Sequence, residues 1–124
     1  MSHNFRIRTL GIQADILHLL IPNCLDTVTA YCLQDKIESF IRAGFSKYII
    51  DLSDATYVSS AGIQVIILLQ KRMYDNHGGV VLTNIPEKIY RLFAKIGVTE
   101  MCGMAETIAQ ALQTFESDEQ PYQS

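Results

Sequence analysis

The segment TYVSSAGIQVIILL, residues 56–69, gives the clearest indication of how this chain folds. Two serines stand directly before an apolar run that a surface loop would not need. A serine side chain at the start of a helix accepts a hydrogen bond from a backbone N–H group that has no partner within the helix. The segment therefore predicts a helix that begins at Ser59 or Ser60 and ends before Gly78.

Steps of 100° per residue, counted from Ser60, divide this predicted helix into a core side and an outward side. The core side consists of Gly62, Ile63, Ile66, Leu69 and Met73. The outward side is polar and consists of Ser60, Gln64, Lys71 and Asp75, with Ile67 and Leu68 at its borders. An outward surface that is partly apolar suits a protein partner better than it suits solvent.

The remaining segments alternate between short apolar runs and helical patterns. Strands are predicted within residues 5–9, 15–22, 47–52, 80–83 and 98–103, and further helices at about 27–43, 86–96 and 105–115. The expected apolar face of helix 27–43 consists of Val28, Cys32, Ile37, Phe40 and Ile41, and that of helix 86–96 of Ile89, Leu92, Phe93 and Ile96. This order predicts an α/β fold with a mixed sheet, parallel central strands and about four helices. One domain is expected over residues 1–115, followed by a short flexible tail at 116–124.

The composition argues against several functional classes. The chain has 124 residues, a formal charge of −3 and scattered Lys and Arg side chains, so we expect no nucleic-acid surface. The longest wholly apolar run, 65–69, is far short of a membrane span. No signal peptide is visible and the three cysteines form no C-x-x-C pair, which is typical of a cytoplasmic protein with reduced thiols. The histidines are isolated, and we expect neither a metal nor a cofactor.

Several short motifs follow one another along the chain. Residues 51–53 read DLS and residues 57–63 read YVSSAGI, in which two hydroxyl residues precede Ala-Gly and an aliphatic helix. Residues 24–26 read CLD before the first predicted helix, and GGVVL (78–82) and IGV (96–98) follow later. Together these motifs resemble the STAS domain, a family named for sulfate transporters and anti-sigma factor antagonists. The resemblance covers almost the whole chain.

For a stand-alone domain, the resemblance implies an anti-sigma factor antagonist. The unphosphorylated protein would bind an anti-sigma factor that is also a serine kinase, and would thereby release a sigma factor. The kinase would phosphorylate Ser60, which aligns with the phosphorylated serine of the family motif, and a PP2C-type phosphatase would reverse this step. Two positions depart from the family pattern: Ser59 replaces an acidic residue and Asn23 replaces a glycine.

The family position and the helix pattern together select further site residues. Asp26 is expected to cap the first helix and, by its family position, to lie on the rim beside Ser60. The expected partner surface consists of Asp26, Ser59, Ser60, Gln64, Ile67 and Leu68. Asp51 is expected to accept backbone N–H bonds in the loop that follows it, and Gly62 to allow close packing of the helix against the sheet. Tyr57 is expected to pack beneath this loop.

Two alternatives to this interpretation differ in strength. Ser60, Asp51 and either His18 or His77 supply the residue types of a nucleophilic triad. However, the serine lies outside a G-x-S-x-G motif and no oxyanion-hole glycine stretch is evident, so we expect no catalytic residue. Nucleotide binding is not expected either, because no Gly-rich phosphate loop is present. The stronger alternative is a non-enzymatic STAS binding subunit of a sensory complex or of a transport ATPase, which need not be phosphorylated.

Overall fold

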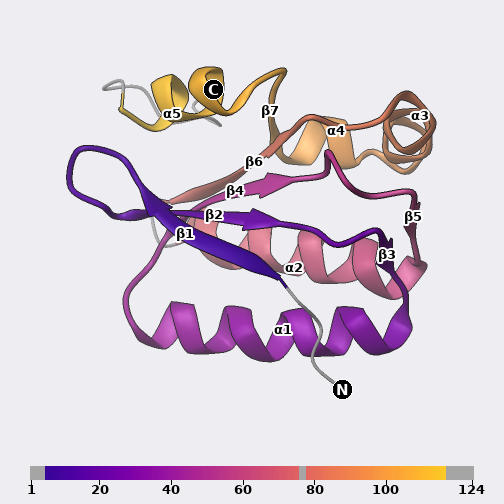
Figure 1. Cartoon of the computed structure of the whole chain (residues 1–124), viewed down its shortest axis with the longest axis horizontal. Coiled ribbons are helices and arrows are strands. Elements are labelled where there is room, and N and C mark those ends of the chain that lie inside the picture. Colours follow the sequence, from indigo (N-terminus) through magenta and orange to yellow (C-terminus); the bar gives the residue numbers. More distant parts are fainter. Residues whose placement is uncertain (1–4, 76–77, 117–124) are drawn as a thin grey trace.

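Five strands form one mixed sheet in the order β1-β2-β4-β6-β7 (Figure 1). The structure, a computed structural model, describes residues 5–75 and 78–116. The strands are β1 (Arg6–Leu10), β2 (Ile16–Leu20), β4 (Lys47–Asp51), β6 (Gly79–Thr83) and β7 (Gly103–Ala105). β1 is antiparallel to β2, and the other neighbours in this sheet run parallel. The predicted α/β fold with parallel central strands is confirmed.

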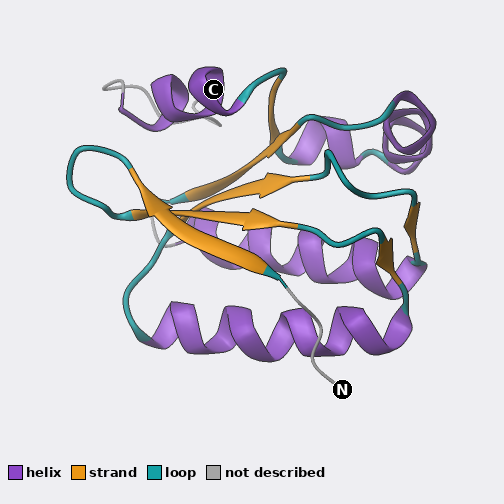
Figure 2. Ribbon diagram, viewed as in Figure 1, coloured by secondary structure: helices purple, strands orange, loops and turns teal. Residues whose placement is uncertain are grey.

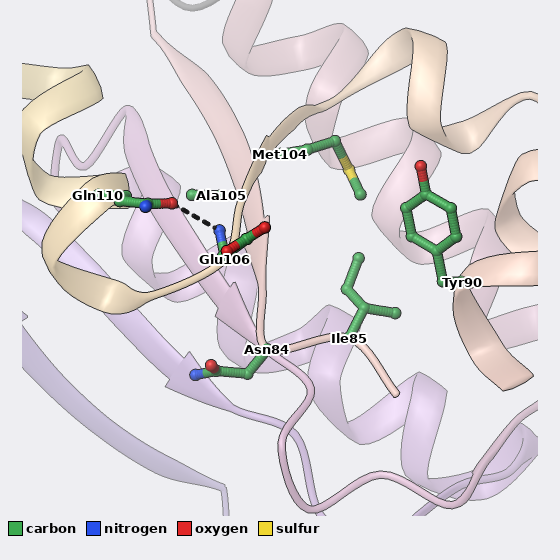
Figure 3. A pocket seen from close by; sticks show the side chains of 7 residues that line it. All are labelled: Asn84, Ile85, Tyr90, Met104, Ala105, Glu106 and Gln110. Atoms are coloured by element: carbon green, nitrogen blue, oxygen red, sulfur yellow. Dashed lines mark hydrogen bonds between the residues drawn. The ribbon is translucent and has the colours of Figure 1, made fainter. Parts of the chain in front are cut away.

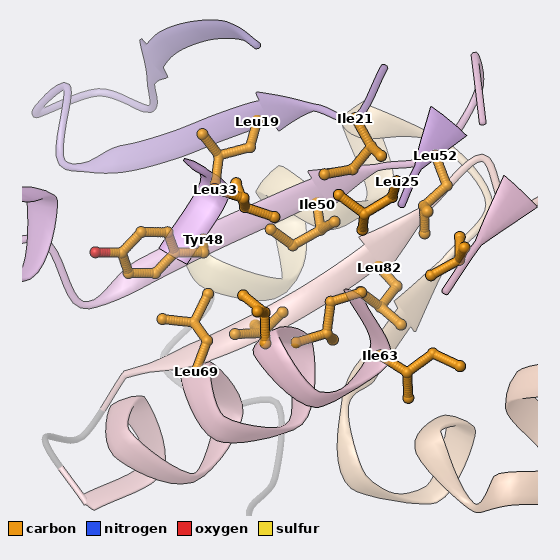
Figure 4. Close-up of a cluster of buried hydrophobic side chains, with 14 of the residues drawn as sticks. Leu19, Ile21, Leu25, Leu33, Tyr48, Ile50, Leu52, Ile63, Leu69 and Leu82 are labelled. Carbon is orange, nitrogen blue, oxygen red and sulfur yellow. The ribbon is translucent and has the colours of Figure 1, made fainter. Parts of the chain in front are cut away.

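The helices divide between the two faces of this sheet (Figure 2). α1 (Thr27–Arg42) and α2 (Ser60–Asp75) pack on one face, and α5 (Ile108–Glu116) packs on the other. α3 (Glu87–Ile96) and the short α4 (Val98–Met101) contribute to the same core as α1 and α2. Side chains alternate along a strand, so Tyr48 and Ile50 of β4 face α1 and α2 (Figure 4), whereas Ile49 faces α5. The central strands β2, β4 and β6 are therefore buried at nearly every position.

A second sheet of only two short strands connects the loops that precede α1 and α2. β3 (Cys24–Leu25) and β5 (Tyr57–Val58) run parallel and pair Cys24 with Tyr57 and Leu25 with Val58. The Ser59 N–H donates to the Leu25 carbonyl oxygen at 2.8 Å and so extends this pairing to the helix start. Strands of two residues carry no usable periodicity, and the sequence did not predict them.

The C-terminal part of the chain differs from its prediction. The last strand, predicted within residues 98–103, starts only at Gly103: Gly97, with φ of 96°, ends α3, and the chain then makes the single turn of α4. The last strand is Gly103–Ala105, and α5 starts at Ile108 because the Thr107 hydroxyl accepts the Gln110 N–H at 3.1 Å and caps the helix. Glu116, expected in the tail, is the last residue of α5, and residues 117–124 lie outside the described residues.

Three side chains expected in the core are exposed, and one expected beneath a loop is exposed as well. Val28 is 61% exposed because the buried stripe of α1 consists of Thr29, Ala30, Leu33 and Ile37. Leu92 and Ile96 lie at the edge of the α3 stripe, where Ile89 and Phe93 are buried. Tyr57 is 53% exposed because Val58 points into the core, and alternation along β5 turns Tyr57 outward.

Candidate functional site

The two serines at the start of α2 have different environments. Ser59 is buried and caps the helix: its Oγ accepts the Gly62 N–H at 3.1 Å, and its carbonyl oxygen accepts the Ile63 N–H at 3.0 Å. Ser60 is the first residue of α2 and is exposed. Within the described residues, no hydrogen bond engages the Ser60 hydroxyl. One serine is therefore part of the fold, and the other is accessible to a second protein.

Alanine substitutions are expected to separate these two roles. Ser59→Ala removes the cap and should lower the free energy of unfolding by about 1–2 kcal/mol. Ser60→Ala should change it by less than about 0.5 kcal/mol because the side chain is exposed. Urea unfolding of both variants, followed by circular dichroism, tests this difference. Equal losses for the two variants would contradict the assignment of Ser59 as the cap.

The pairing of β3 with β5 places Asp26 at the same end of the molecule as Ser60. Asp26 follows Leu25, whose carbonyl oxygen accepts the Ser59 N–H. Asp26 Oδ1 accepts the Thr29 N–H at 2.8 Å, so Asp26 is the N-cap of α1. α1 and α2 thus begin side by side (Figure 1), and the positive ends of their helix dipoles lie together.

Gly62 permits this close approach of α2 to the β3–β5 pair. A Cβ atom at this position would lie 2.7 Å from Cδ2 of Leu25, a fully buried side chain, and 3.2 Å from Cγ1 of Val58. The first distance is shorter than real Cβ contacts and the second is tighter than most, so a side chain here would force Leu25 or α2 to shift.

The outward strip of α2 continues from Ser60 to a groove against α1. Gln64 is exposed, and Leu68 is 49% exposed and lines a groove of about 110 Å³ between the two helices. Ile67 flanks the strip on the other side, half-buried against the core. The buried side of the helix is as predicted, with Gly62, Ile63, Ile66, Leu69 and Met73 all buried.

A buried polar cluster lies at the carboxyl end of β4, before the loop that leads to Ser60. Asp51 Oδ1 accepts the Ser53 N–H at 3.0 Å and an N–H of the Asn84 amide at 3.2 Å, and Oδ2 lies 2.9 Å from His18 Nε2. Arg8 Nε donates to His18 Nδ1 at 2.9 Å, so the proton of the neutral imidazole is on Nε2 and is donated to Asp51. This cluster fixes the start of the loop.

The pKa of Asp51 lies below its ordinary value. Burial acts to raise it, but hydrogen bonds from the Ser53 backbone, His18, the Ser53 side chain and Asn84 favour the carboxylate and outweigh burial. A carboxyl group whose pKa is lower in the folded than in the unfolded state stabilises the fold at pH values above its unfolded-state pKa. This contribution is lost as the pH falls through the folded-state pKa.

We therefore expect a loss of stability in acid that depends on Asp51. The free energy of unfolding of the wild type should fall as the pH drops below about 4. This fall should be shallower for Asp51→Asn, which has no carboxyl group to titrate there. Urea denaturation at a series of pH values measures both slopes, and parallel curves would contradict the prediction.

The residues of the hypothetical triad are not assembled. His18 and Asp51 point to the face of the sheet that carries α5, whereas Ser60 starts a helix on the opposite face. His77 lies outside the described residues. No group of three metal-ligating side chains occurs within residues 5–75 and 78–116.

Sequence reasoning missed two features of this region. The hydrogen bond between His18 and Asp51 can be predicted only when the strand order is known, because the two residues lie on neighbouring strands that are distant in the sequence. Exposed aromatic side chains near the helix starts, Tyr31 and Tyr57, were also missed. Helical stepping from the Asp26 cap would have placed Tyr31 away from the buried stripe.

The fold and the arrangement of the helix starts define a small α/β domain with an accessible serine on its rim. The family profile of the STAS domain matches residues 9–111, and the chain therefore belongs to the STAS domain family. None of the helices within the described residues is long and apolar enough to cross a membrane.

Similar proteins carry related names. BtrV of Bordetella bronchiseptica, assigned as an anti-sigma factor antagonist, is 23% identical over 112 residues, which cover 87% of this chain and 97% of BtrV. The crystal structure of TM1081 from Thermotoga maritima, with the same assignment, has a TM-score of 0.83 at 22% identity and covers 91% of this chain and 95% of its own. The structure of phosphorylated SpoIIAA of Bacillus, a cell fate determinant, has a TM-score of 0.71 at 16% identity and covers 89% of this chain and 97% of its own. The chain thus shares the fold of anti-sigma factor antagonists.

Proposed function

We propose that this protein is a cytoplasmic, non-enzymatic anti-sigma factor antagonist that is switched off by phosphorylation of Ser60. In its unphosphorylated form it binds an anti-sigma factor with serine kinase activity and so releases a sigma factor. A PP2C-type phosphatase returns it to the binding form. The observation that carries this proposal is the exposed Ser60 hydroxyl at the start of α2, next to a buried Ser59 that is already used as the cap.

The partner surface in this proposal surrounds Ser60. Asp26 and Ser59 set the two helix starts, and Gln64, Ile67 and Leu68 continue the surface along α2. The mixture of polar and partly exposed apolar side chains resembles the composition of protein interfaces that form and dissociate. This surface supports binding of a protein better than binding of a small substrate.

Phosphate at Ser60 would act on binding and leave the fold intact. It adds about −1.5 to −2 charges at neutral pH. The free N–H groups and the dipole at a helix start favour an anion, so the domain tolerates the group. In a complex, the same anion must lose its water or meet carboxylates of the partner, which costs affinity.

Phosphopeptide mapping of the protein from its own host, before and after phosphatase treatment, tests the proposal. A removable phosphate on Ser60 is the expected result. Phosphate on Ser59 would contradict the proposal, which assigns the phosphate to the exposed Ser60 and treats the buried Ser59 hydroxyl as the helix cap. Absence of phosphate under several growth conditions would instead favour a constitutive STAS binding subunit of a sensory complex or of a transport ATPase.

A further inference from the structure

A pocket of about 620 Å³ opens at the carboxyl ends of β6 and β7, away from the α1–α2 surface. It is lined by Asn84, Ile85, Tyr90, Met104, Ala105, Glu106 and Gln110. Its volume lies within the range of small-molecule sites, about 300–1,000 Å³. None of these residues belongs to the surface proposed for the anti-sigma factor.

The topology of the sheet explains why a pocket forms here. After β6 the chain leads to α3, whose buried side chains join the core of the α1–α2 face. After β7 it leads to α5, which packs on the opposite face. Two neighbouring parallel strands thus send their connections to opposite faces, and the crevice between such connections is where open α/β sheets bind ligands.

The polar groups of the pocket are the Glu106 carboxylate, the side-chain amides of Asn84 and Gln110, and the Tyr90 hydroxyl. Glu106 is exposed and is the one charged residue among the seven lining residues. Asn84 has a left-handed backbone with φ of 55°, and its amide N–H group is turned to Asp51, which leaves its Oδ1 atom as a free acceptor within the described part of the chain. Gln110 Oε1 is already occupied by the Glu106 N–H at 2.9 Å. The seven lining residues include one anion and no cation, which disfavours phosphate and carboxylate ligands.

The other wall is apolar. Figure 3 shows Ile85, Met104 and Tyr90 together on the α3 side, across from Asn84, Glu106 and Gln110. The Tyr90 ring is about half exposed, so it offers both an apolar face and the negative potential of an aromatic ring. A ligand that fits both walls combines a cationic group with a short hydrocarbon or aromatic part.

We propose that this pocket binds a small organic amine, with its ammonium group against Glu106 and Asn84 and its hydrocarbon against Ile85, Met104 and Tyr90. This site is separate from the proposed partner switch and does not depend on it. It is connected to the Ser60 loop through Asn84, because Asp51 accepts hydrogen bonds from both Asn84 and the Ser53 N–H. An occupant that holds Asn84 in place would also stabilise the start of that loop.

Titration of the full ¹⁵N-labelled chain with phenethylamine, followed by NMR, tests this site. The expected result is a saturable shift of backbone N–H signals at Ile85, Glu106 and Gln110. The matched anion 3-phenylpropionate, which has a similar skeleton with a carboxylate in place of the amine, should give no saturable shift at these positions. Saturable binding of both probes, or of neither, would overturn the proposal.

Glu106→Gln provides the residue-specific test. The substitution keeps the backbone N–H that Gln110 accepts and removes only the charge. It should weaken phenethylamine binding at least about tenfold, as expected for loss of a charged hydrogen bond. Glu100→Gln, on an exposed residue of α4 outside the pocket lining, is the matched control and should bind the amine like the wild type. Unchanged affinity in Glu106→Gln would refute the assignment.

Discussion

Ser60→Asp is expected to weaken binding to the proposed partner, an anti-sigma factor kinase, by more than about a hundredfold, which corresponds to about 3 kcal/mol. The substitution places a negative charge at the centre of the proposed partner surface, where it must be desolvated in the complex. The domain itself should remain as stable as the wild type, because an acidic side chain in the first turn of α2 interacts favourably with the helix dipole. Calorimetric titration of the purified partner into wild type, Ser60→Ala and Ser60→Asp measures the effect.

Thr107→Asp is the matched control for charge. Thr107 caps α5 on the opposite face of the sheet, and aspartate is equally suited to that position. This variant adds the same charge at a helix start and should bind the partner like the wild type. If Ser60→Asp also binds as tightly as the wild type, the proposed switch is wrong.

Asp51→Ala is expected to cause the largest loss of stability, about 3–4 kcal/mol. The substitution leaves the buried His18 Nε2–H and the partly buried donors of the Ser53 backbone and the Asn84 amide without their acceptor. Each buried donor without a partner costs about 1–3 kcal/mol. Because domains of this size are stable by only about 5–15 kcal/mol, the loss is a large fraction of the total.

Urea denaturation at neutral pH measures this loss, with Asp54→Ala as the control. Asp54 lies in the same loop and carries the same charge, but it is exposed. Its replacement should change the free energy of unfolding by less than about 0.5 kcal/mol. Similar values for Asp51→Ala and Asp54→Ala would show that the polar cluster does not hold the loop.

Much of the fold is predictable because its long elements carry clear periodicity. The helical spacing of Ile63, Ile66, Leu69 and Met73 gave the phase of α2 correctly, and the apolar runs at β4 and β6 marked the central strands. Short elements were missed or wrong. β3 and β5 have two residues each, and α4 is a single turn after Gly97. None of these three elements is long enough to show a repeating pattern of apolar residues.

The candidate site was predicted in part. Its serines, Asp26 and the outward strip of α2 follow from caps and helical stepping, and they remain proposals for partner binding. The pocket beside Asn84 was not predicted, because its lining comes from the ends of β6 and β7 and from two helices. Residues that converge from four elements leave no local pattern in the sequence.

The sequence by itself determined the α/β class, the start and phase of α2, and the pair of hydroxyls at its start. Those properties depend on local backbone preferences and on the spacing of apolar residues, which are properties of each segment alone. Only the tertiary structure decided that Ser59 is buried as the cap and Ser60 is exposed, and that His18 meets Asp51. Hydrogen bonds between segments distant in the sequence, such as that from the Ser59 N–H to Leu25, depend on how the strands are ordered, and no local pattern specifies that order.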